Sequence, residues 1–175
     1  VSTSSAIVSK GGNSVSLSLI ESFSGLNEFI SSEMDSDPIL DFSGLASRNI
    51  KGSVSISREA GYDSIIGFYQ IQTHNGDVLD PLTGTLLSPG SDGYADAALN
   101  SINLFNEFGG LSTENDSTKT IAISSFSNAG ILAPYANITT TGEKFFSFAE
   151  ANSDGLSHFR SLGSGVIGVE DLKGG

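Results

Sequence analysis

Short runs in which apolar residues alternate with serine place the strongest constraint on how this chain folds. Residues 15–19 read Val-Ser-Leu-Ser-Leu, and residues 53–57 read Ser-Val-Ser-Ile-Ser. Successive side chains of a β-strand point to opposite faces, so a period of two buries one face and leaves the other in water. An amphipathic helix would instead repeat its apolar residues every three or four positions. The chain is therefore expected to build half-buried strands.

Other runs extend this pattern along most of the chain. Asn75-Gly76 lies between two apolar runs and predicts a hairpin, and residues 94–99 predict one short helix. Residues 21–36 are ambiguous, because their apolar residues fall at helical spacing before Pro38. We expect an all-β protein, an antiparallel β-sandwich or jelly-roll-like fold with one or two short helices. Its further strands are predicted at residues 39–45, 65–72, 119–127, 143–150, 156–162 and 165–170.

Length and composition indicate one globular domain preceded by an arm. The chain has 175 residues, of which 38% are hydrophobic and 11 are Phe, so it can bury a core that a disordered linker lacks. The first 14 residues are rich in serine and contain Gly11-Gly12 near their end. Residues 1–14 are therefore predicted to form an arm, and residues 15–175 a single β-sandwich-like domain.

Acidic residues dominate the charge of the chain. Asp and Glu number 20 against 8 Lys and Arg, which gives a formal net charge of −12. Nucleic acids and anionic membranes would repel such a chain, so neither is expected as a partner. No segment approaches the roughly 18 consecutive apolar residues of a membrane span, so membrane insertion is not expected. The charge suits extracellular surroundings and leaves carboxylates free for Ca²⁺.

The sequence offers few groups for catalysis. Cys is absent, and the two His are His74 and His158. The motifs G-x-S-x-G, G-x-x-x-x-G-K-[ST] and H-E-x-x-H are all missing. Glu170 and Asp171 are adjacent, so on a strand they would point to opposite faces instead of converging on one bond. We therefore expect a protein that is not an enzyme, with a hydrolase built on His158 as a remote alternative.

Two glycine-containing segments carry candidate ligands for a cation. Asn152-Ser153-Asp154-Gly155 supplies two side-chain oxygens before a glycine, and Glu170-Asp171 precedes Gly174-Gly175. Ca²⁺ takes six to eight oxygen ligands from carboxylates, amides and carbonyls, often on such loops. Asn152, Asp154, Glu170 and Asp171 are therefore predicted to contribute to a Ca²⁺ site. The competing interpretation is an Asx-turn at Asn152 with solvated carboxylates elsewhere.

Phe145-Phe146-Ser147-Phe148 is the densest aromatic run. On a strand, Phe146 and Phe148 share one side and Phe145 faces the other, which favours core packing over a stacking platform for sugars. We also expect Ile66, Phe68 and Ile167 to be buried, because each lies in an apolar run of strand character.

Several segments together resemble a known family. The C-terminal motif is similar to the family catalogued as domain of unknown function 4114, and the region before it resembles the matching part of many bacterial, notably cyanobacterial, exoproteins. The resemblance covers about residues 54–175 and rests on Glu59–Tyr69, Gly76, Pro89–Ala98, Phe145–Gly155, Ser157–Arg160, Val166–Leu172 and Gly174-Gly175. It implies a secreted or surface protein without established enzyme activity. It also implies the four ligands named above, with Asp63 as a further candidate.

The family pattern continues past the glycine pair into an acidic run and a last apolar strand, which this chain is expected to lack. A sheet without its last strand would expose unpaired backbone groups. The N-terminal arm, which carries Ala6-Ile7-Val8 before its glycines, is predicted to add as a strand to a neighbouring copy. The alternatives are an arm that folds back on its own domain and an arm that stays disordered.

The expected function follows from these features. The chain is predicted to be a structural or adhesive, calcium-associated module that is secreted or at the cell surface. One alternative is a self-assembling subunit of an extracellular filament, sheath or surface layer, and another is a carbohydrate-binding module. The expected partners are a second copy of the chain, through the arm, or surface glycans.

Overall fold

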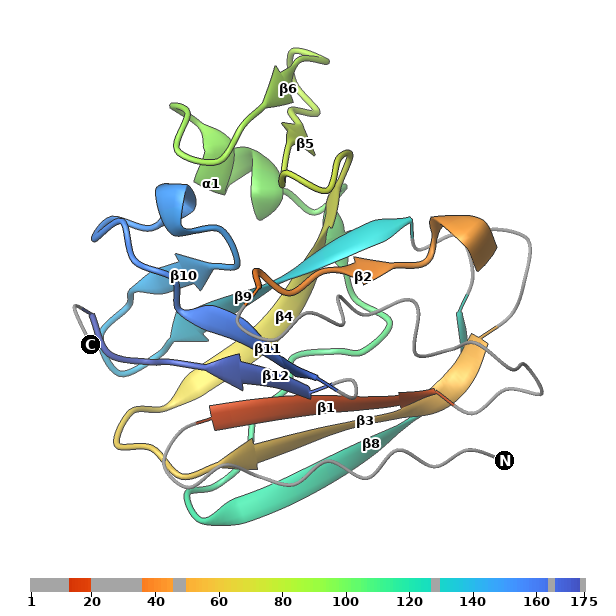
Figure 1. Cartoon of the computed structure of the whole chain (residues 1–175), viewed down its shortest axis with the longest axis vertical. Helices are drawn as coiled ribbons and strands as arrows, with labels where there is room; N and C mark the ends of the chain where they lie inside the picture. Colours follow the sequence, from red (N-terminus) through yellow and green to blue (C-terminus); the bar gives the residue numbers. More distant parts are fainter. Residues whose placement is uncertain (1–12, 20–35, 46–49, 127–129, 164–165, 174–175) are drawn as a thin grey trace.

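The structure is a computed structural model that describes residues 13–19, 36–45, 50–126, 130–163 and 166–173 (Figure 1). They form two antiparallel sheets packed face to face, which confirms the expected all-β, sandwich-like fold. The first sheet contains, in spatial order, β11 (Phe159–Gly163), β12 (Val166–Val169), β1 (Asn13–Leu19), β3 (Ile50–Arg58) and β8 (Ser117–Phe126). The second sheet contains β10 (Lys144–Phe146), β9 (Ile131–Ile138), β4 (Ser64–Ile71) and β7 (Leu104–Phe105), with β2 (Leu40–Asp41) paired to β9.

The first sheet joins the two ends of the described chain. β1 lies between β12 and β3, with Asn13 opposite Val169 and Ser14 opposite Ser57. The sheet therefore begins at Asn13, two residues before the predicted start of the domain. Residues 1–12 of the predicted arm and residues 21–35 of the ambiguous segment lie outside the described residues.

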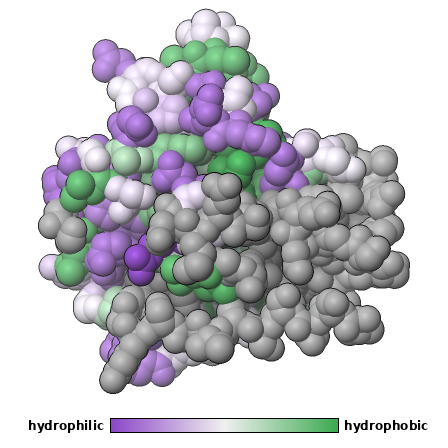
Figure 2. Space-filling model, viewed as in Figure 1, coloured by the Kyte–Doolittle hydropathy of each residue, from purple (hydrophilic) through white to green (hydrophobic). Residues whose placement is uncertain are grey.

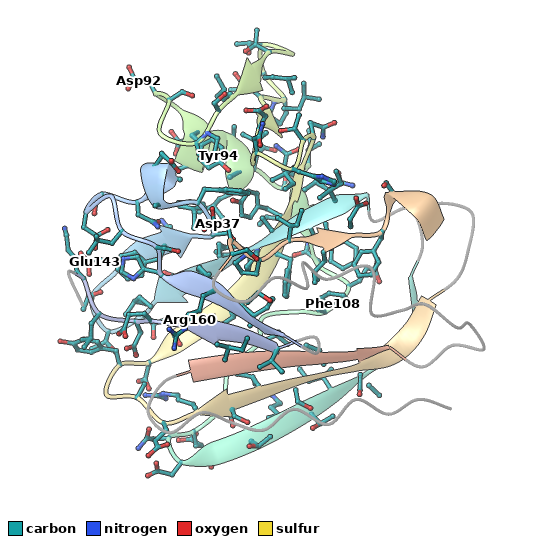
Figure 3. All side chains as sticks on the ribbon, in the orientation of Figure 1. Asp37, Asp92, Tyr94, Phe108, Glu143 and Arg160 are labelled. Carbon is teal, nitrogen blue, oxygen red and sulfur yellow. The ribbon has the colours of Figure 1, made fainter. Side chains whose placement is uncertain are left out.

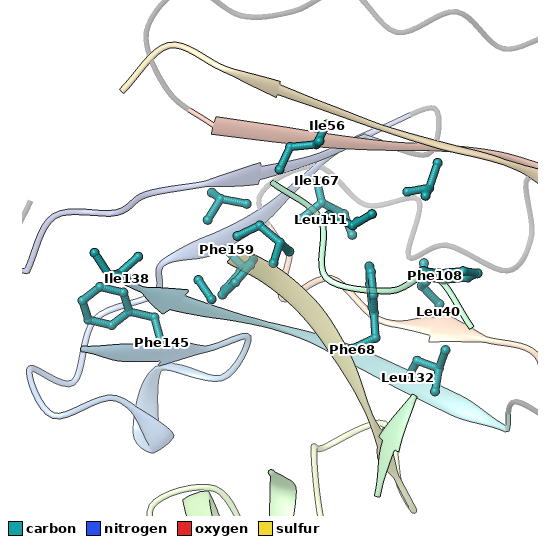
Figure 4. Packing of buried hydrophobic residues seen from close by; sticks show 14 of the residues in the cluster. Leu40, Ile56, Phe68, Phe108, Leu111, Leu132, Ile138, Phe145, Phe159 and Ile167 are labelled. Carbon is teal, nitrogen blue, oxygen red and sulfur yellow. The ribbon is translucent and has the colours of Figure 1, made fainter. Parts of the chain in front are cut away.

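The main core fills the space between the sheets (Figure 4). Val54 and Ile56 of β3 are buried, as the alternation with serine predicts. Ile66, Phe68 and Ile167 are also buried, which confirms the prediction for these three residues. Further members of this cluster are Leu40, Phe42, Phe108, Leu111, Leu132, Ala136, Ile138, Phe145, Phe159 and Val169.

A second apolar cluster lies around α1 (Tyr94–Ala98). Phe146 and Phe148 belong to this cluster, whereas Phe145 belongs to the main core. The three rings are 1–5% exposed, so the aromatic run is core and its predicted division between two sides is confirmed. The Tyr69 ring meets both Phe146 and Tyr94 edge-on, which ties the short helix to β4 and β10.

β9 lies inside the second sheet although it contains Pro134. β4 pairs with one side of β9 along its whole length, and β2 and β10 pair with the two ends of the other side. Ile138 donates its N–H to Glu143 on this second side at 2.8 Å, and Pro134 has the same parity along the strand. The proline nitrogen therefore faces the gap between β2 and β10, where its missing N–H removes no ladder bond. No strand is predicted here from sequence, because proline is uncommon inside sheets.

The Asn75-Gly76 turn is present, but it does not close a hairpin. Gly76 has φ +91°, as a tight turn requires, yet β5 (Val78–Leu79) pairs with β6 (Leu86–Leu87) and not with β4. The predicted hairpin is therefore wrong in its pairing. The turn instead packs against the Phe148 ring, since a Cβ at Gly76 would lie 2.5 Å from that ring.

β5, β6 and α1 lie together at one end of the molecule (Figure 1). Leu79, Leu82, Leu86 and Ile102 are exposed in this part of the chain, at 37–88%. Figure 2 shows hydrophobic surface at this end beside hydrophilic residues. No helix among the described residues is long and apolar enough to cross a membrane.

Candidate functional site

His158 lies at the centre of the predicted calcium segments. Its side chain is 1% exposed, and its ring stacks on Phe145 with centroids 3.5 Å apart and planes at 9°. Nε2 lies 3.0 Å from an Asp154 carboxylate oxygen, and Nδ1 lies 3.1 Å from the Glu170 carbonyl oxygen. The structure thus brings Asp154 and Glu170 to opposite nitrogens of one imidazole.

The contacts of the His158 ring connect two segments of the chain. Ionised carboxylate and carbonyl oxygens are hydrogen-bond acceptors, and which ring nitrogen donates depends on the tautomer. The Glu170 N–H also donates to the His158 carbonyl at 2.8 Å. These contacts hold the Asp154 loop against the segment that follows β12.

Asn152 is used entirely for local structure. Its Oδ1 accepts the Phe146 N–H at 2.7 Å, and its Nδ2 donates to the Phe146 and Leu156 carbonyls at 3.0 and 2.8 Å. The residue is 6% exposed and follows η3 (Ala149–Ala151). The side-chain oxygen that was predicted to bind Ca²⁺ therefore accepts a hydrogen bond from the backbone instead.

The other three residues of this prediction differ in how their oxygens are used. Asp154 accepts the Leu156 N–H at 3.1 Å in addition to its contact with His158. Glu170 is exposed and accepts the Leu172 N–H through Oε1 at 3.1 Å, and Asp171 is buried at 7% exposure. Across the part of the chain that the structure describes, no group of three or more His, Asp or Glu side chains is arranged to hold a metal ion.

Asp63 lies apart from these residues, in the loop between β3 and β4. Its carboxylate is 71% exposed and forms an ion pair with the Arg58 guanidinium at 2.6 Å. Its backbone carbonyl accepts the Thr139 N–H at 2.8 Å, and its N–H donates to the Thr140 hydroxyl at 2.9 Å. The implied set of five ligands is therefore divided between two regions of the sandwich.

A second group of titratable residues lies near α1. Burial raises the pKa of Asp37, and the Glu150 carboxylate adds to the rise. Burial also raises the pKa of Tyr69 and of Tyr94, and Figure 3 shows the Tyr94 side chain at α1. The Tyr94 hydroxyl donates to the Gly76 carbonyl at 2.7 Å and lies 3.1 Å from the Tyr69 hydroxyl. These tyrosines anchor the helix and the 73–77 turn to β4.

The sequence prediction missed the role of His158, which it considered only as a remote catalytic residue. It also missed Arg58 and Lys119, although the period of two was a usable signal. Val54 and Ile56 are inward, so the same parity places Arg58 inward, and Lys119 lies opposite Ile56 in the sheet. Extending the alternation past the apolar residues would have identified both cations.

The chain matches no protein-family model, no curated protein and no solved structure. The resemblance to the domain of unknown function 4114 family therefore stays a prediction.

Proposed function

We propose that this chain is a non-enzymatic adhesive module of an extracellular protein, with glycans as its partner. The observation that supports the proposal is the outward face of β3 and β8. The Ser55 and Thr120 hydroxyls on this face lie 2.7 Å apart, and so do those of Ser57 and Thr118. The intervening residues of β3 point inward, which leaves two rows of paired, uncharged hydroxyls on a sheet.

Such a face suits contact with a hydroxyl-rich polymer. Each hydroxyl donates and accepts, so it exchanges partners with sugar hydroxyls or ordered water without burying a charge. The sheet holds the side chains in fixed register, which lowers the entropy lost on binding. Backbone pairing places Ser16 opposite Ser55 and Ser14 opposite Ser57.

The state of the two imidazoles supports a role other than catalysis. His158 is buried with both ring nitrogens in contacts. The His74 ring nitrogen bonds the Asp41 carboxylate at 2.7 Å. In these positions both rings stabilise loops.

The proposal is tested by retention on insoluble cellulose, chitin and starch particles. We expect the full chain to be retained on at least one of them. Thr118→Glu with Thr120→Glu should release it, because two carboxylates would then occupy the neutral face. The control is Ser101→Glu with Asn106→Glu, which adds the same charge at exposed loop positions. Lack of retention of the wild-type chain, or equal retention of both double variants, would contradict the proposal.

Calcium association is part of the proposal, centred on Glu170. Asn152, Asp154 and Asp171 are largely buried, and the oxygens of Asn152 and Asp154 hold protein groups. Glu170 is exposed, although its Oε1 accepts the Leu172 N–H, and an exposed carboxylate is the kind of oxygen ligand that Ca²⁺ prefers.

Self-assembly is a second candidate function, favoured by the edge of the first sheet. β8 is ten residues long and ends this sheet, and no described strand pairs with its outer side. An open edge of this length is a template for strand addition by another copy. Negative staining and light scattering at rising concentration should then show filaments that a deletion of residues 1–12 abolishes. A monomer at every concentration would contradict this candidate.

A further inference from the structure

A pocket of about 490 Å³ lies where β3 leads into β4. It is lined by two cations and two carboxylates, by several hydroxyls and by one aliphatic side chain. The residues used below are Arg58, Lys119, Asp63, Glu114, Thr113 and Ile65. The pocket is separate from the His158 cluster, and of the predicted calcium ligands it contains Asp63 alone.

The two cations line the pocket because the inward-facing positions of β3 and β8, here called the inward stripe, change from apolar to cationic residues at one end of the sheet. Val54 and Ile56 are buried in the core, and Arg58 continues the same parity at the end of β3. On β8, Ile121 lies opposite Val54 and Lys119 lies opposite Ile56. Paired residues share a face of the sheet, so Lys119 and Arg58 follow the core residues inward. Interior positions of a sandwich are ordinarily apolar, so the largely buried Arg58 and the exposed Lys119 mark the place where the inward stripe leaves the core.

Arg58 is held rigidly. Its side chain is 9% exposed, and its guanidinium contacts an Asp63 oxygen at 2.6 Å, the Thr113 carbonyl at 3.2 Å and the Ala60 carbonyl at 3.4 Å. Its Nε has no hydrogen-bond partner, although it is buried. A buried donor without a partner is rare in a folded protein and calls for an explanation. A role in positioning Asp63 at the pocket explains why a charged side chain is kept here in place of an apolar one.

Lys119 and the carboxylates differ from Arg58 in being accessible. Lys119 is exposed and has no ion-pair partner within the described ranges of the chain. The Asp63 carboxylate is 71% exposed, and Glu114 is also exposed. The pocket therefore presents donors and acceptors that are free to exchange water for a ligand.

We propose that this pocket binds a single neutral saccharide unit, which rests on the proposed function by giving glycan adhesion a specific site. The two cations and two carboxylates cancel, so an anion would meet Asp63 and Glu114, and a cation would meet Lys119 and Arg58. A sugar hydroxyl donates to a carboxylate and accepts from an ammonium at once, so a mixed set of charges satisfies it. Ile65 is 37% exposed and offers an apolar contact for the C–H face of a sugar ring.

The test is an array of neutral, uronic-acid and sialylated oligosaccharides, followed by titration of the full chain with the neutral oligosaccharide that binds. Lys119→Gln and Glu114→Gln each remove one charge from the pocket. We expect either change to weaken neutral-saccharide binding about tenfold or more, because each removes a charge-assisted hydrogen bond. Lys144→Gln is the matched control, since Lys144 is exposed on β10 and does not line the pocket. It should bind as the wild type does.

Other outcomes separate this inference from the proposed function. Neutral binding that survives Lys119→Gln and Glu114→Gln but is lost in Thr118→Glu with Thr120→Glu would overturn the pocket and leave adhesion standing. Binding of acidic saccharides alone, or of glycine as a zwitterion in place of sugars, would overturn the assigned ligand class. A Lys119→Gln variant that instead forms oligomers and keeps the sugar affinity of the wild type would show that Lys119 prevents strand addition at the edge of β8. That result would overturn the inference. Binding to no glycan would overturn both proposals.

Discussion

The His158 side chain connects three segments in the C-terminal part of the described chain. It contacts the loop after η3 through Asp154 and the segment after β12 through Glu170, and it stacks on Phe145 in the main core. Its neighbours on the two nitrogens are the Asp154 carboxylate, which is 10% exposed, and the Glu170 carbonyl oxygen. Removing the ring would therefore lose both contacts and leave a cavity beside Phe145.

His158→Ala is expected to reduce the free energy of unfolding by about 3 kcal/mol, from the lost hydrogen bonds and the cavity. His74→Ala is the matched control, because the His74 side chain is 64% exposed and forms one surface contact with Asp41. It should change stability by less than about 1 kcal/mol. Urea unfolding of both variants measures the difference, and equal midpoints would show that the His158 contacts add no stability.

Asp41 gives a pH dependence with a definite sign. Burial alone would raise the pKa of Asp41, but hydrogen bonds from Ser43 and His74 outweigh it and hold that pKa below its usual value of 3.8. The stabilisation is therefore fully present above pH 3.8 and is lost as the pH falls through the lower pKa of the folded state. We expect Asp41→Asn to destabilise the protein by about 0.5–1 kcal/mol at pH 7 and by progressively less as the pH falls below 3.8. Urea unfolding midpoints of the variant and the wild type, measured from pH 7 downwards, give the loss at each pH. A loss of equal size at every pH would contradict this origin of the stabilisation.

Alanine substitutions at Gly76 and Gly84 distinguish the cost of backbone strain from the cost of a steric clash. Both have positive φ, +91° and +71°, but a Cβ at Gly76 would strike the Phe148 ring whereas one at Gly84 meets nothing within 4 Å. Gly84→Ala should lose about 1 kcal/mol through backbone strain alone. Gly76→Ala should lose about 1–3 kcal/mol more, because the buried ring must shift. Thermal unfolding of the pair measures this difference, and equal losses would mean that Phe148 yields freely.

At the scale of the element, β9 is held by three other strands. β4 covers one side, and β2 and β10 share the other. Its one proline sits in the gap that these two short strands leave. The position of Pro134 is thus compatible with a strand inside a sheet, whereas a proline two residues further along would face β10 directly.

Moving the proline tests this description. Ala136→Pro should destabilise the protein by about 3 kcal/mol or more, because Ala136 pairs with Phe145 and would lose its N–H there. Pro134→Ala should change stability by about 1 kcal/mol or less, since its nitrogen faces no described strand. Chemical denaturation compares the two. If both variants lost a similar free energy of unfolding, the Pro134 nitrogen would not face the gap between β2 and β10.

Sequence patterns predicted the elements that have a regular apolar pattern. Alternation identified β3, a longer apolar run identified β4, and residues 94–99 identified α1. β9 was missed because burial on both faces and Pro134 hide the alternation. In the candidate site, the two glycine-containing acidic segments indicated Asp154 and Glu170 as parts of one Ca²⁺ site, which stays a prediction, and both residues contact His158. The sequence could not reveal that backbone N–H groups and His158 already occupy the oxygens, because those bonds depend on how loops distant in sequence meet.

At the scale of the whole molecule, the negative charge is distributed unevenly over the fold. The formal net charge is −12, yet the inward stripe of the first sheet ends in two cations and its outward face carries hydroxyls at β3 and β8. Two carboxylates, Asp63 and Glu114, lie beside these cations in the pocket, and Glu170 and Asp171 lie at the end of the described chain. A divalent cation bound there would act on the stability of the entire domain, since β12 pairs directly with β1.

Millimolar Ca²⁺ is accordingly expected to raise the melting temperature relative to EDTA. A ligand that binds only the native state adds about 2.7 kcal/mol at a hundredfold excess over its dissociation constant. Glu170→Gln should remove the shift, and Glu107→Gln, exposed in a distant loop, should keep it. Differential scanning calorimetry gives the answer, and identical melting in Ca²⁺ and EDTA would count against calcium association of this chain.

The position of β1 between β12 and β3 also has a kinetic consequence. Asn13 pairs with Val169, so this ladder closes a loop that includes almost the whole described chain. Closing a loop of that length loses much chain entropy before any contact compensates for it, and folds rich in such distant pairings form slowly. The first sheet is therefore completed only after β12 has been synthesised, because the neighbours of β1 come from both sides of the sequence.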